Sequence, residues 1–185
     1  MLHHIKAALL AIVFAAFSAV SSGNAADPEN TLFLDLPTGR VVIEMRPDLA
    51  PNHVARIKEL ARAGFYDGTP FHRVIAGFMV QGGDPTGSGT GGSGKGKLKG
   101  EFSKERHVRG VTSMARAANP DSADSQFFIM LGEAGYLDGQ YTVWGKVVSG
   151  MEHVDMIKKG NPQDNGIVKN PDRIVKMRVA ADVKE

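Results

Sequence analysis

The sequence predicts a mainly β fold: a closed eight-stranded antiparallel β-barrel capped by two α-helices. Short runs rich in β-branched and aromatic residues recur along the chain, separated by Gly, Pro and Asn. Only two segments place apolar residues at helical spacing. Many short strands joined by long connections are typical of antiparallel barrels, in which closure removes exposed strand edges. No internal repeat or linker interrupts this pattern, so the 185 residues predict one domain.

Residues 1–26 have the pattern of a secretory signal peptide. Lys6 precedes an apolar run from Ala7 to Val20, and small residues lead to Ala25 and Ala26. The run is shorter than the roughly 20 residues that span a bilayer, and it lacks the polar stripe of a surface helix. We expect cleavage after Ala25 or Ala26, secretion across the inner membrane to the periplasm, and no stable membrane insertion afterwards. An uncleaved membrane tether is the alternative.

The first half of the mature chain predicts a β-hairpin, a helix and a strand pair. Two β-rich runs, 31–36 and 40–45, flank a Pro-Thr-Gly turn. Apolar residues then recur at helical spacing over 51–63, where a proline opens the segment and a glycine follows it. The short apolar runs 71–75 and 78–81 predict two further strands.

The second half predicts a long loop, four strands and a short helix. Residues 82–100 are so rich in Gly, Ser and Lys that they predict a loop, and loops of this length are usually functional or mobile. A helix is expected over 151–159, ending at Gly160. The four β-rich runs are 111–115, 126–130, 141–148 and 174–180.

Composition and charge exclude several classes of protein. The chain has no cysteine, which excludes disulfides, thiolate metal sites and a catalytic cysteine. Removal of residues 1–26 takes away one base, Lys6, and no acid, so the net charge falls from +2 to +1. A nearly neutral chain predicts no nucleic-acid partner. The basic residues between Lys95 and Arg106 are interpreted as a solvated loop, because no aromatic residues alternate with them. We expect a monomer.

The Gly-rich loop matches nucleotide-binding motifs only weakly. Residues 87–92 satisfy G-x-G-x-x-G, and residues 89–95 nearly complete a phosphate-binding loop. Both motifs need a helix directly after them, and Gly94, Gly96 and Gly100 oppose one. No serine lies in a G-x-S-x-G hydrolase motif. The histidines lack metal-ligand spacing, so we predict neither a metal site nor a cofactor.

Two polar side chains interrupt the apolar strand pair. Arg73 and Gln81 occur among Phe78 and Met79, where a simply apolar pair is expected. Side chains alternate along a strand, so two neighbouring strands could present Arg73, Met79 and Gln81 side by side. Spacing alone favours a plainer interpretation, in which Arg73 forms a salt bridge at the rim beside core Phe and Met side chains.

The segment Phe71–Asp84 closely resembles the signature of the cyclophilin family of peptidyl-prolyl cis-trans isomerases. Together with five other matching blocks, the resemblance covers residues 30–181 of a mature domain expected at 27–185. It implies the same eight-stranded barrel with two helices, and an enzyme that rotates X-Pro bonds of unfolded or partly folded polypeptides without a cofactor. The signal-like segment indicates that these polypeptides are exported. The other matching blocks, in family order, are Gly89-Thr90-Gly91-Gly92, Ser113-Met114-Ala115-Arg116, Ser125-Gln126-Phe127-Phe128-Ile129, Tyr136-Leu137-Asp138-Gly139 and Trp144-Gly145-Lys146-Val147.

The resemblance also implies which residues act. Arg73 is expected to be the catalytic guanidinium, with Gln81 orienting it and touching the substrate backbone, and with Phe78 beside them. Phe78 is further expected to line the proline pocket with Met79, Phe128 and Leu137. The other expected substrate-binding residues are His72, Ala115, Arg116 (through its backbone), Ala117, Tyr136 and Tyr141.

Two positions depart from the pattern of many relatives. Tyr136 stands where the best-known eukaryotic members carry Trp, which predicts weak cyclosporin binding, and Tyr141 stands where many relatives carry His. The alternative function is a non-catalytic, chaperone-like binder of extended proline-containing chains. Arg73 favours the enzyme, because a binder needs no charge at the amide nitrogen.

Overall fold

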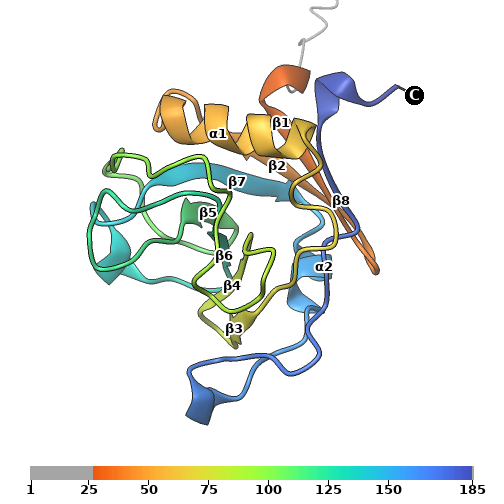
Figure 1. Ribbon diagram of the computed structural model, residues 1–185, viewed down its shortest axis with the longest axis vertical. Coiled ribbons are helices and arrows are strands. Elements are labelled where there is room, and N and C mark those ends of the chain that lie inside the picture. The colour runs from red at the N-terminus through yellow and green to blue at the C-terminus, as the bar shows by residue number, and fades with distance from the viewer. Residues whose placement is uncertain (1–26, 185) are drawn as a thin grey trace, which may run out of the picture.

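The computed structural model describes residues 27–184 and contains one eight-stranded antiparallel sheet (Figure 1). The strand order is β3-β4-β6-β5-β7-β2-β1-β8. The predicted fold class is therefore confirmed. The predicted signal peptide lies outside the described residues. The strands are β1 (Thr31–Leu36), β2 (Gly39–Met45), β3 (Arg73–Ile75), β4 (Met79–Gly82), β5 (Val111–Met114), β6 (Phe127–Met130), β7 (Val143–Ser149) and β8 (Lys176–Val179).

The ring of strands is not complete, which refines the prediction of a closed barrel. Strands β3 and β8 are the two ends of the sheet and do not pair with each other. Irregular backbone hydrogen bonds join the segments that precede these two strands instead. The N–H of Gly68 donates to the carbonyl of Ile174 over 2.8 Å, and that of Phe71 donates to Asp172 over 2.9 Å. The barrel is thus curled and bridged by irregular backbone, because the segment before β8 takes the place of a ninth strand.

The inner face of the barrel follows strand alternation. On β1, Leu32, Leu34 and Leu36 are buried, as are alternate residues of β2, its hairpin partner. Burial of such side chains contributes about 1.5–3 kcal/mol each relative to exposure. Trp144 and Tyr66 pack edge-on against Phe127 with ring centroids 5.9 and 5.7 Å away. This cluster forms the main core beneath α1 (Pro51–Arg62).

Helix α1 begins with a cap from a distant residue. Ala50, which precedes the helix, has no capping side chain. Instead, the carboxylate of Glu101 accepts from the backbone N–H groups of Asn52 (3.1 Å) and His53 (3.0 Å) and from His53 Nδ1 (2.6 Å). The first N–H groups of a helix have no partner within it. Glu101 therefore satisfies two of them and also places a negative charge at the positive end of the helix.

The second helix is shorter than predicted. Helix α2 covers Met151–Asp155, whereas the sequence predicts 151–159. The backbone N–H of Lys158 donates to Asp172 Oδ2 (2.8 Å), and that of Gly160 donates to the carbonyl of Val74 (2.9 Å). These tertiary partners replace the helical acceptors, so the chain leaves the helix and crosses to the edge of β3. In Figure 1 this segment extends below β3 before it returns to β8.

The part of the chain that the structure describes also contains four short 3-10 helices that the sequence does not predict. They lie at Pro28–Asn30, Gly135–Leu137, Pro162–Asp164 and Ala180–Asp182. Helix α1 contacts β8, and α2 contacts β2. Within residues 27–184 no helix is long and apolar enough to cross a bilayer.

Candidate active site

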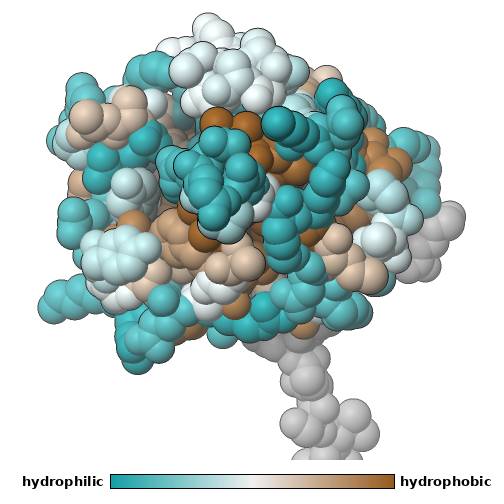
Figure 2. All heavy atoms as spheres, turned by 90° about the horizontal axis from the view of Figure 1, so that it is seen from below, coloured by the Kyte–Doolittle hydropathy of each residue, from teal (hydrophilic) through white to brown (hydrophobic). Residues whose placement is uncertain are grey.

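A cavity of about 430 Å³ opens on the barrel between β3, β4, β6 and the segment after β5. It brings together ten of the twelve residues that the resemblance implies. On the face in Figure 2, hydrophilic side chains cover most of the surface and apolar atoms show between them. The lining residues are His72, Arg73, Phe78, Met79, Gln81, Ser88, Gly89, Ala115, Arg116, Phe128, Leu137, Tyr141, Asn165 and Ile167.

The register of β3 and β4 sets Arg73 directly opposite Gln81, with Met79 opposite Ile75. Arg73 Nη1 donates to Gln81 Oε1 over 3.2 Å. The predicted alignment of these polar side chains is therefore confirmed. The plainer interpretation, a salt bridge at the rim, is wrong, because Arg73 contacts no carboxylate within the described part of the chain.

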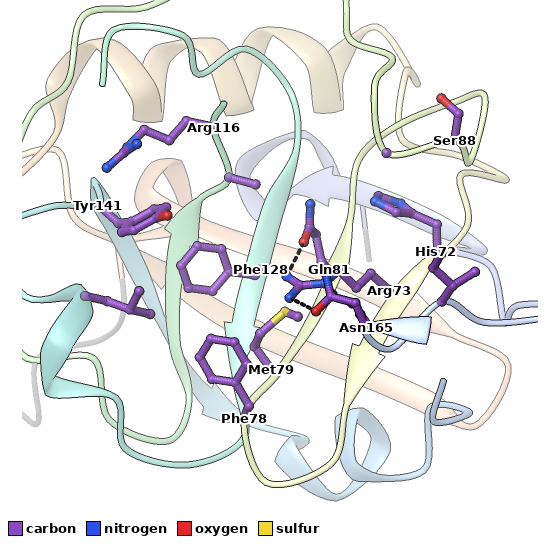
Figure 3. Close-up of a pocket in the computed structure, with 14 residues that line it drawn as sticks. His72, Arg73, Phe78, Met79, Gln81, Ser88, Arg116, Phe128, Tyr141 and Asn165 are labelled. Carbon is purple, nitrogen blue, oxygen red and sulfur yellow. Dashed lines mark hydrogen bonds between the residues drawn. The ribbon is translucent and has the colours of Figure 1, made fainter. Parts of the chain in front are cut away.

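The acceptors around Arg73 are all neutral. Its other partners are the backbone carbonyl and the side-chain oxygen of Asn165 (Figure 3). Burial lowers the pKa of the Arg73 guanidinium, which nevertheless stays protonated at neutral pH. The site thus holds a half-buried positive charge at the wall of an apolar cavity, and no carboxylate of residues 27–184 contacts it.

Aromatic packing holds the apolar wall. The Phe128 ring is buried, lies 5.8 Å from the Tyr141 ring at an edge-on angle, and stacks 6.1 Å from the His107 ring. Phe78 and Met79 continue the wall (Figure 3), and Leu137 also lines the cavity. This wall is concave and apolar, as a pocket for a small aliphatic ring requires.

A buried polar chain stands behind this wall. His107 Nδ1 bonds to Asp138 Oδ1 (2.9 Å), and its Nε2 lies 3.1 Å from Ser113 Oγ. Although the order is Asp, His, Ser, the serine hydroxyl is fully buried and donates to the carbonyl of Thr142 over 2.8 Å. These hydrogen bonds therefore fasten the 3-10 turn of Leu137 to β5, and their role is structural.

The residues after β5 form one edge of the cavity. Ala115 and Arg116 line it, while Ala117 lines a neighbouring hollow of about 260 Å³. The Arg116 guanidinium lies 4.3 Å from the centre of the Tyr141 ring and donates to the carbonyl of Gln140. Its charge is therefore engaged with Tyr141, which leaves its backbone as the part that can face a ligand.

Tyr136 lies at the rim rather than in the cavity. Its side chain is 67% exposed, and its ring is 6.0 Å from that of Phe78. Ala117 and Tyr136 are thus the two residues implied by the resemblance that do not line the main cavity.

Two buried carboxylates organise the Gly-rich loop. Asp84 accepts from the backbone N–H groups of Thr86 (2.8 Å), Gly89 (2.7 Å) and Gly91 (3.1 Å). Burial opposes ionisation of Asp84, but these hydrogen bonds outweigh it and lower the pKa to about 2. Asp124 binds the other part of the loop through the N–H of Ser93 and through Arg56 of α1.

This arrangement argues against both nucleotide-binding motifs. The N–H groups that would bind phosphate are already bonded to Asp84, and no helix begins in the loop. A side chain at Gly91 would collide with the Asp84 carboxylate, and one at Gly92 would collide with Asp124. The glycines are therefore explained by close approach to the two carboxylates rather than by a ligand.

His72 lies beside the cavity, as implied, and is buried. Neither ring nitrogen has a hydrogen-bond partner among the described residues. Burial lowers the pKa of His72, so the imidazole is neutral at pH 7. No group of three or more His, Asp or Glu side chains in residues 27–184 is arranged to hold a metal ion.

Four lining residues were not predicted from the sequence: Ser88, Gly89, Asn165 and Ile167. Gly89 belongs to the block Gly89–Gly92 that resembles the family, but nothing in that block assigns it to the cavity. The dipeptide Asn165-Gly166 is a turn signal, and a turn signal does not reveal which strand the turn contacts. Asn165 and Ile167 lie far from Arg73 in the sequence, so only the fold brings them to it.

The fold and the site together define an eight-stranded β-barrel in which a guanidinium, without a carboxylate partner in residues 27–184, borders an apolar pocket. A family model described as cyclophilin type peptidyl-prolyl cis-trans isomerase/CLD matches residues 33–179. The chain belongs to the cyclophilin family, and it is a peptidyl-prolyl cis-trans isomerase. The resemblance found in the sequence is thereby confirmed.

Relatives in several organisms support this assignment. A probable peptidyl-prolyl cis-trans isomerase of Brucella suis biovar 1 (strain 1330) is 55% identical, over 97% of this chain and 98% of the relative. Peptidyl-prolyl cis-trans isomerase B of Bacillus subtilis (strain 168) is 45% identical over 66% of this chain and 85% of its own length.

Solved structures share the fold. A cyclophilin of Hirschia baltica is 29% identical to this chain, with a TM-score of 0.76. The match covers 86% of this chain and 77% of the Hirschia baltica chain. A Cryptosporidium parvum cyclophilin type isomerase, crystallised in the presence of the dipeptide Ala-Pro, has a TM-score of 0.74 and 27% identity. The match covers 80% of this chain and 98% of the Cryptosporidium parvum chain.

Proposed function

We propose that Arg73 is the catalytic group of this isomerase and that its substrates are X-Pro bonds in exported polypeptides. The observation that carries the first part is the uncompensated Arg73 guanidinium beside the apolar cavity. Because no carboxylate among the described residues binds the Arg73 guanidinium, it is available to a ligand. In this proposal the ligand is the amide of the X-Pro bond that rotates.

The chemistry needs one well-placed donor. Rotation about an X-Pro bond has a barrier of about 18–20 kcal/mol, because the nitrogen lone pair is delocalised into the carbonyl. In the twisted transition state the lone pair returns to nitrogen, which then accepts a hydrogen bond that the planar ground state cannot accept. A guanidinium N–H at that nitrogen therefore binds the transition state more tightly than the substrate.

The surrounding residues position the substrate. The proline ring occupies the wall formed by Phe78, Met79, Phe128 and Leu137, which excludes water from the amide. The peptide backbone runs along Ala115, Arg116 and Ala117, and Gln81 contacts the backbone while it holds Arg73. His72, Tyr136 and Tyr141 border the pocket. The neutral His72 adds no second charge beside the guanidinium.

A rate assay tests the role of Arg73. We expect Arg73→Ala to lower kcat/KM for a short Ala-Pro-Phe peptide by about 10²–10³-fold. Arg173→Ala is a matched control, since Arg173 is exposed and donates to the carbonyl of Gly68, away from the cavity. Wild-type rates in Arg73→Ala would refute the assignment. Peptide binding by a wild-type protein that did not accelerate exchange would support the chaperone-like alternative.

We also propose that residues 1–26 direct export to the periplasm and are removed there, which leaves a monomeric domain over 27–185. The proposal depends on the apolar run that follows Lys6 and the small residues before Asp27. N-terminal sequencing of protein from the periplasmic fraction should begin at Ala26 or Asp27, and gel filtration should give the mass of one chain. An intact N-terminus in the membrane fraction would contradict export with cleavage.

A further inference from the structure

The segment between α2 and β8 places one side chain against Arg73. Residues 160–168 lie along the free edge of β3 and are fixed there by three backbone hydrogen bonds. Val74 donates to Gly166 (2.8 Å), Gly160 donates to Val74 (2.9 Å), and Val168 donates to His72 (3.0 Å). A side chain at Gly166 would collide with Ile75 and with the backbone of Val74. The segment is therefore closely packed on the strand that carries Arg73.

Asn165 presents two oxygens to one edge of the guanidinium. Its backbone carbonyl accepts from Arg73 Nε over 3.0 Å, and its side-chain oxygen accepts from Nη2 over 2.9 Å (Figure 3). The residue has φ 53° and ψ 34°, the left-handed conformation. Asn adopts this conformation more readily than most other residues with a side chain. In it, both oxygens of Asn165 reach the same guanidinium.

The donors of Arg73 can be counted. A guanidinium has five N–H groups in a rigid plane. Asn165 takes one from Nε and one from Nη2, and Gln81 takes one from Nη1. One N–H on each terminal nitrogen remains without a partner among the described residues. Asn165 and Gln81 bind different edges of the guanidinium and together fix its direction. The bond to Gln81 alone, at 3.2 Å, would leave the guanidinium plane free to turn.

We propose that Asn165 is a positioning residue for Arg73, which aims the two remaining N–H groups at the cavity. The inference rests on the proposed role of Arg73 as the catalytic group. Small displacements of a catalytic group lower the rate strongly, because the gain depends on near-ideal geometry. Asn165 acts on the direction of the guanidinium and contributes little to substrate affinity, so its loss changes kcat more than KM.

The chain contains a matched control for the test. Asn165 and Asn170 are the two residues with positive φ that are not glycine within the described part of the chain. Asn165→Gly removes the side-chain oxygen but keeps a residue that accepts the left-handed conformation. Asn170→Gly makes the same change at an exposed position outside the cavity. We expect Asn165→Gly to lower kcat about tenfold with KM within about twofold, and Asn170→Gly to leave both within about twofold.

A double mutant separates positioning from a general structural effect. In an Arg73→Ala background, Asn165→Gly should cause no further loss, because the residue acts through Arg73. The NMR signal of Arg73 Nε–H supplies a readout besides activity. In Asn165→Gly it should shift and exchange faster with water, while the melting temperatures of Asn165→Gly and Asn170→Gly should agree within about 3 °C.

Two results would overturn the inference. One is wild-type kcat in Asn165→Gly while Arg73→Ala is impaired, which leaves the proposed role of Arg73 intact. The other is a further tenfold loss when Asn165→Gly is added to Arg73→Ala, which would make the segment a general structural support. Full activity of Arg73→Ala would instead refute the catalytic role and the positioning role together.

Discussion

The side-chain N–H of Gln81 donates to the side-chain oxygen of Gln126 over 3.0 Å. Gln126 in turn donates to the carbonyls of Gly89 (3.0 Å) and Gly91 (2.8 Å), in the loop that Asp84 organises. A continuous set of hydrogen bonds therefore connects Asp84 through the loop and the two glutamines to Arg73. The wall of the active site and the Gly-rich loop hold each other in place.

Loss of the Gln126 side chain should impair catalysis, although this side chain does not contact the reacting bond. Gln126→Leu removes the partner of Gln81 and leaves two loop carbonyls unbonded, so we expect kcat/KM to fall about tenfold. Gln163→Leu is the control, because Gln163 is exposed and does not line the cavity. Steady-state rates on an Ala-Pro peptide measure the effect. Equal rates in the two variants would mean that Gln81 is held without Gln126.

The Asp84 carboxylate should be a large single contributor to stability. Asp84→Asn keeps the shape but presents an N–H₂ group to backbone N–H donors. We expect the free energy of unfolding to fall by about 2–4 kcal/mol. Asp121→Asn, at an exposed carboxylate that accepts one backbone N–H from Gly100, should cost less than about 1 kcal/mol. Urea unfolding curves compare the two, and similar midpoints would contradict the role given to Asp84.

The same carboxylate should make stability depend on pH in acid. Its folded pKa of about 2 lies below the unfolded value, so the folded state favours the ionised form. The contribution is fully present above the unfolded pKa of about 3.9 and is lost as the pH falls toward 2. In Asp84→Asn, unfolding free energies measured between pH 6 and pH 2 should decline less steeply than in the wild type. Parallel curves would mean that other carboxylates cause the acid sensitivity.

Protonation of His72 should lower the activity of the enzyme at acidic pH. Burial lowers its pKa below 6.5, so the imidazole becomes charged only when the pH falls through that lower value. Protonation then places a second positive charge beside Arg73 and disturbs the cavity wall. His72→Gln cannot take up this proton, and its kcat/KM should stay level over the range in which the wild type declines. A decline in both proteins would assign the effect to another group.

Phe128 should control substrate affinity as well as rate. Phe128→Leu shortens the proline wall and removes the ring stacked on His107, so KM should rise and kcat/KM should fall about tenfold. Phe102→Leu, at a ring that is 42% exposed and outside the cavity, should behave as the wild type. Peptide titrations followed by NMR measure the affinity. Unchanged affinity in Phe128→Leu would place the proline ring elsewhere.

Local patterns were enough to predict most of the strands and α1. The alternation on β1 and β2 and the helical spacing over α1 each reflect burial of one face, which neighbouring residues record. The alignment of Arg73 with Gln81 also follows from alternation, because the two residues lie on adjacent strands of one hairpin. The roles of the site residues came from the resemblance and not from these patterns.

Features that depend on distant parts of the chain could not be predicted in this way. Glu101 caps α1 from 48 positions away, and Asn165 reaches Arg73 across 92 positions. The end of α2 is set by partners on Asp172 and Val74, so the helical pattern continues past the last helical residue. The Gly-rich loop is ordered by Asp84 and Asp124, and composition alone shows only that it is no helix or strand.

The most direct test of Arg73 as a transition-state donor separates binding from rotation. NMR exchange spectroscopy on an Ala-Pro peptide gives both the dissociation constant and the rate of cis–trans interconversion on the enzyme. For Arg73→Ala we predict a dissociation constant within about threefold of the wild type and interconversion slower by about 10²–10³-fold. Interconversion at the wild-type rate, or a loss of affinity as large as the loss of rate, would contradict the account.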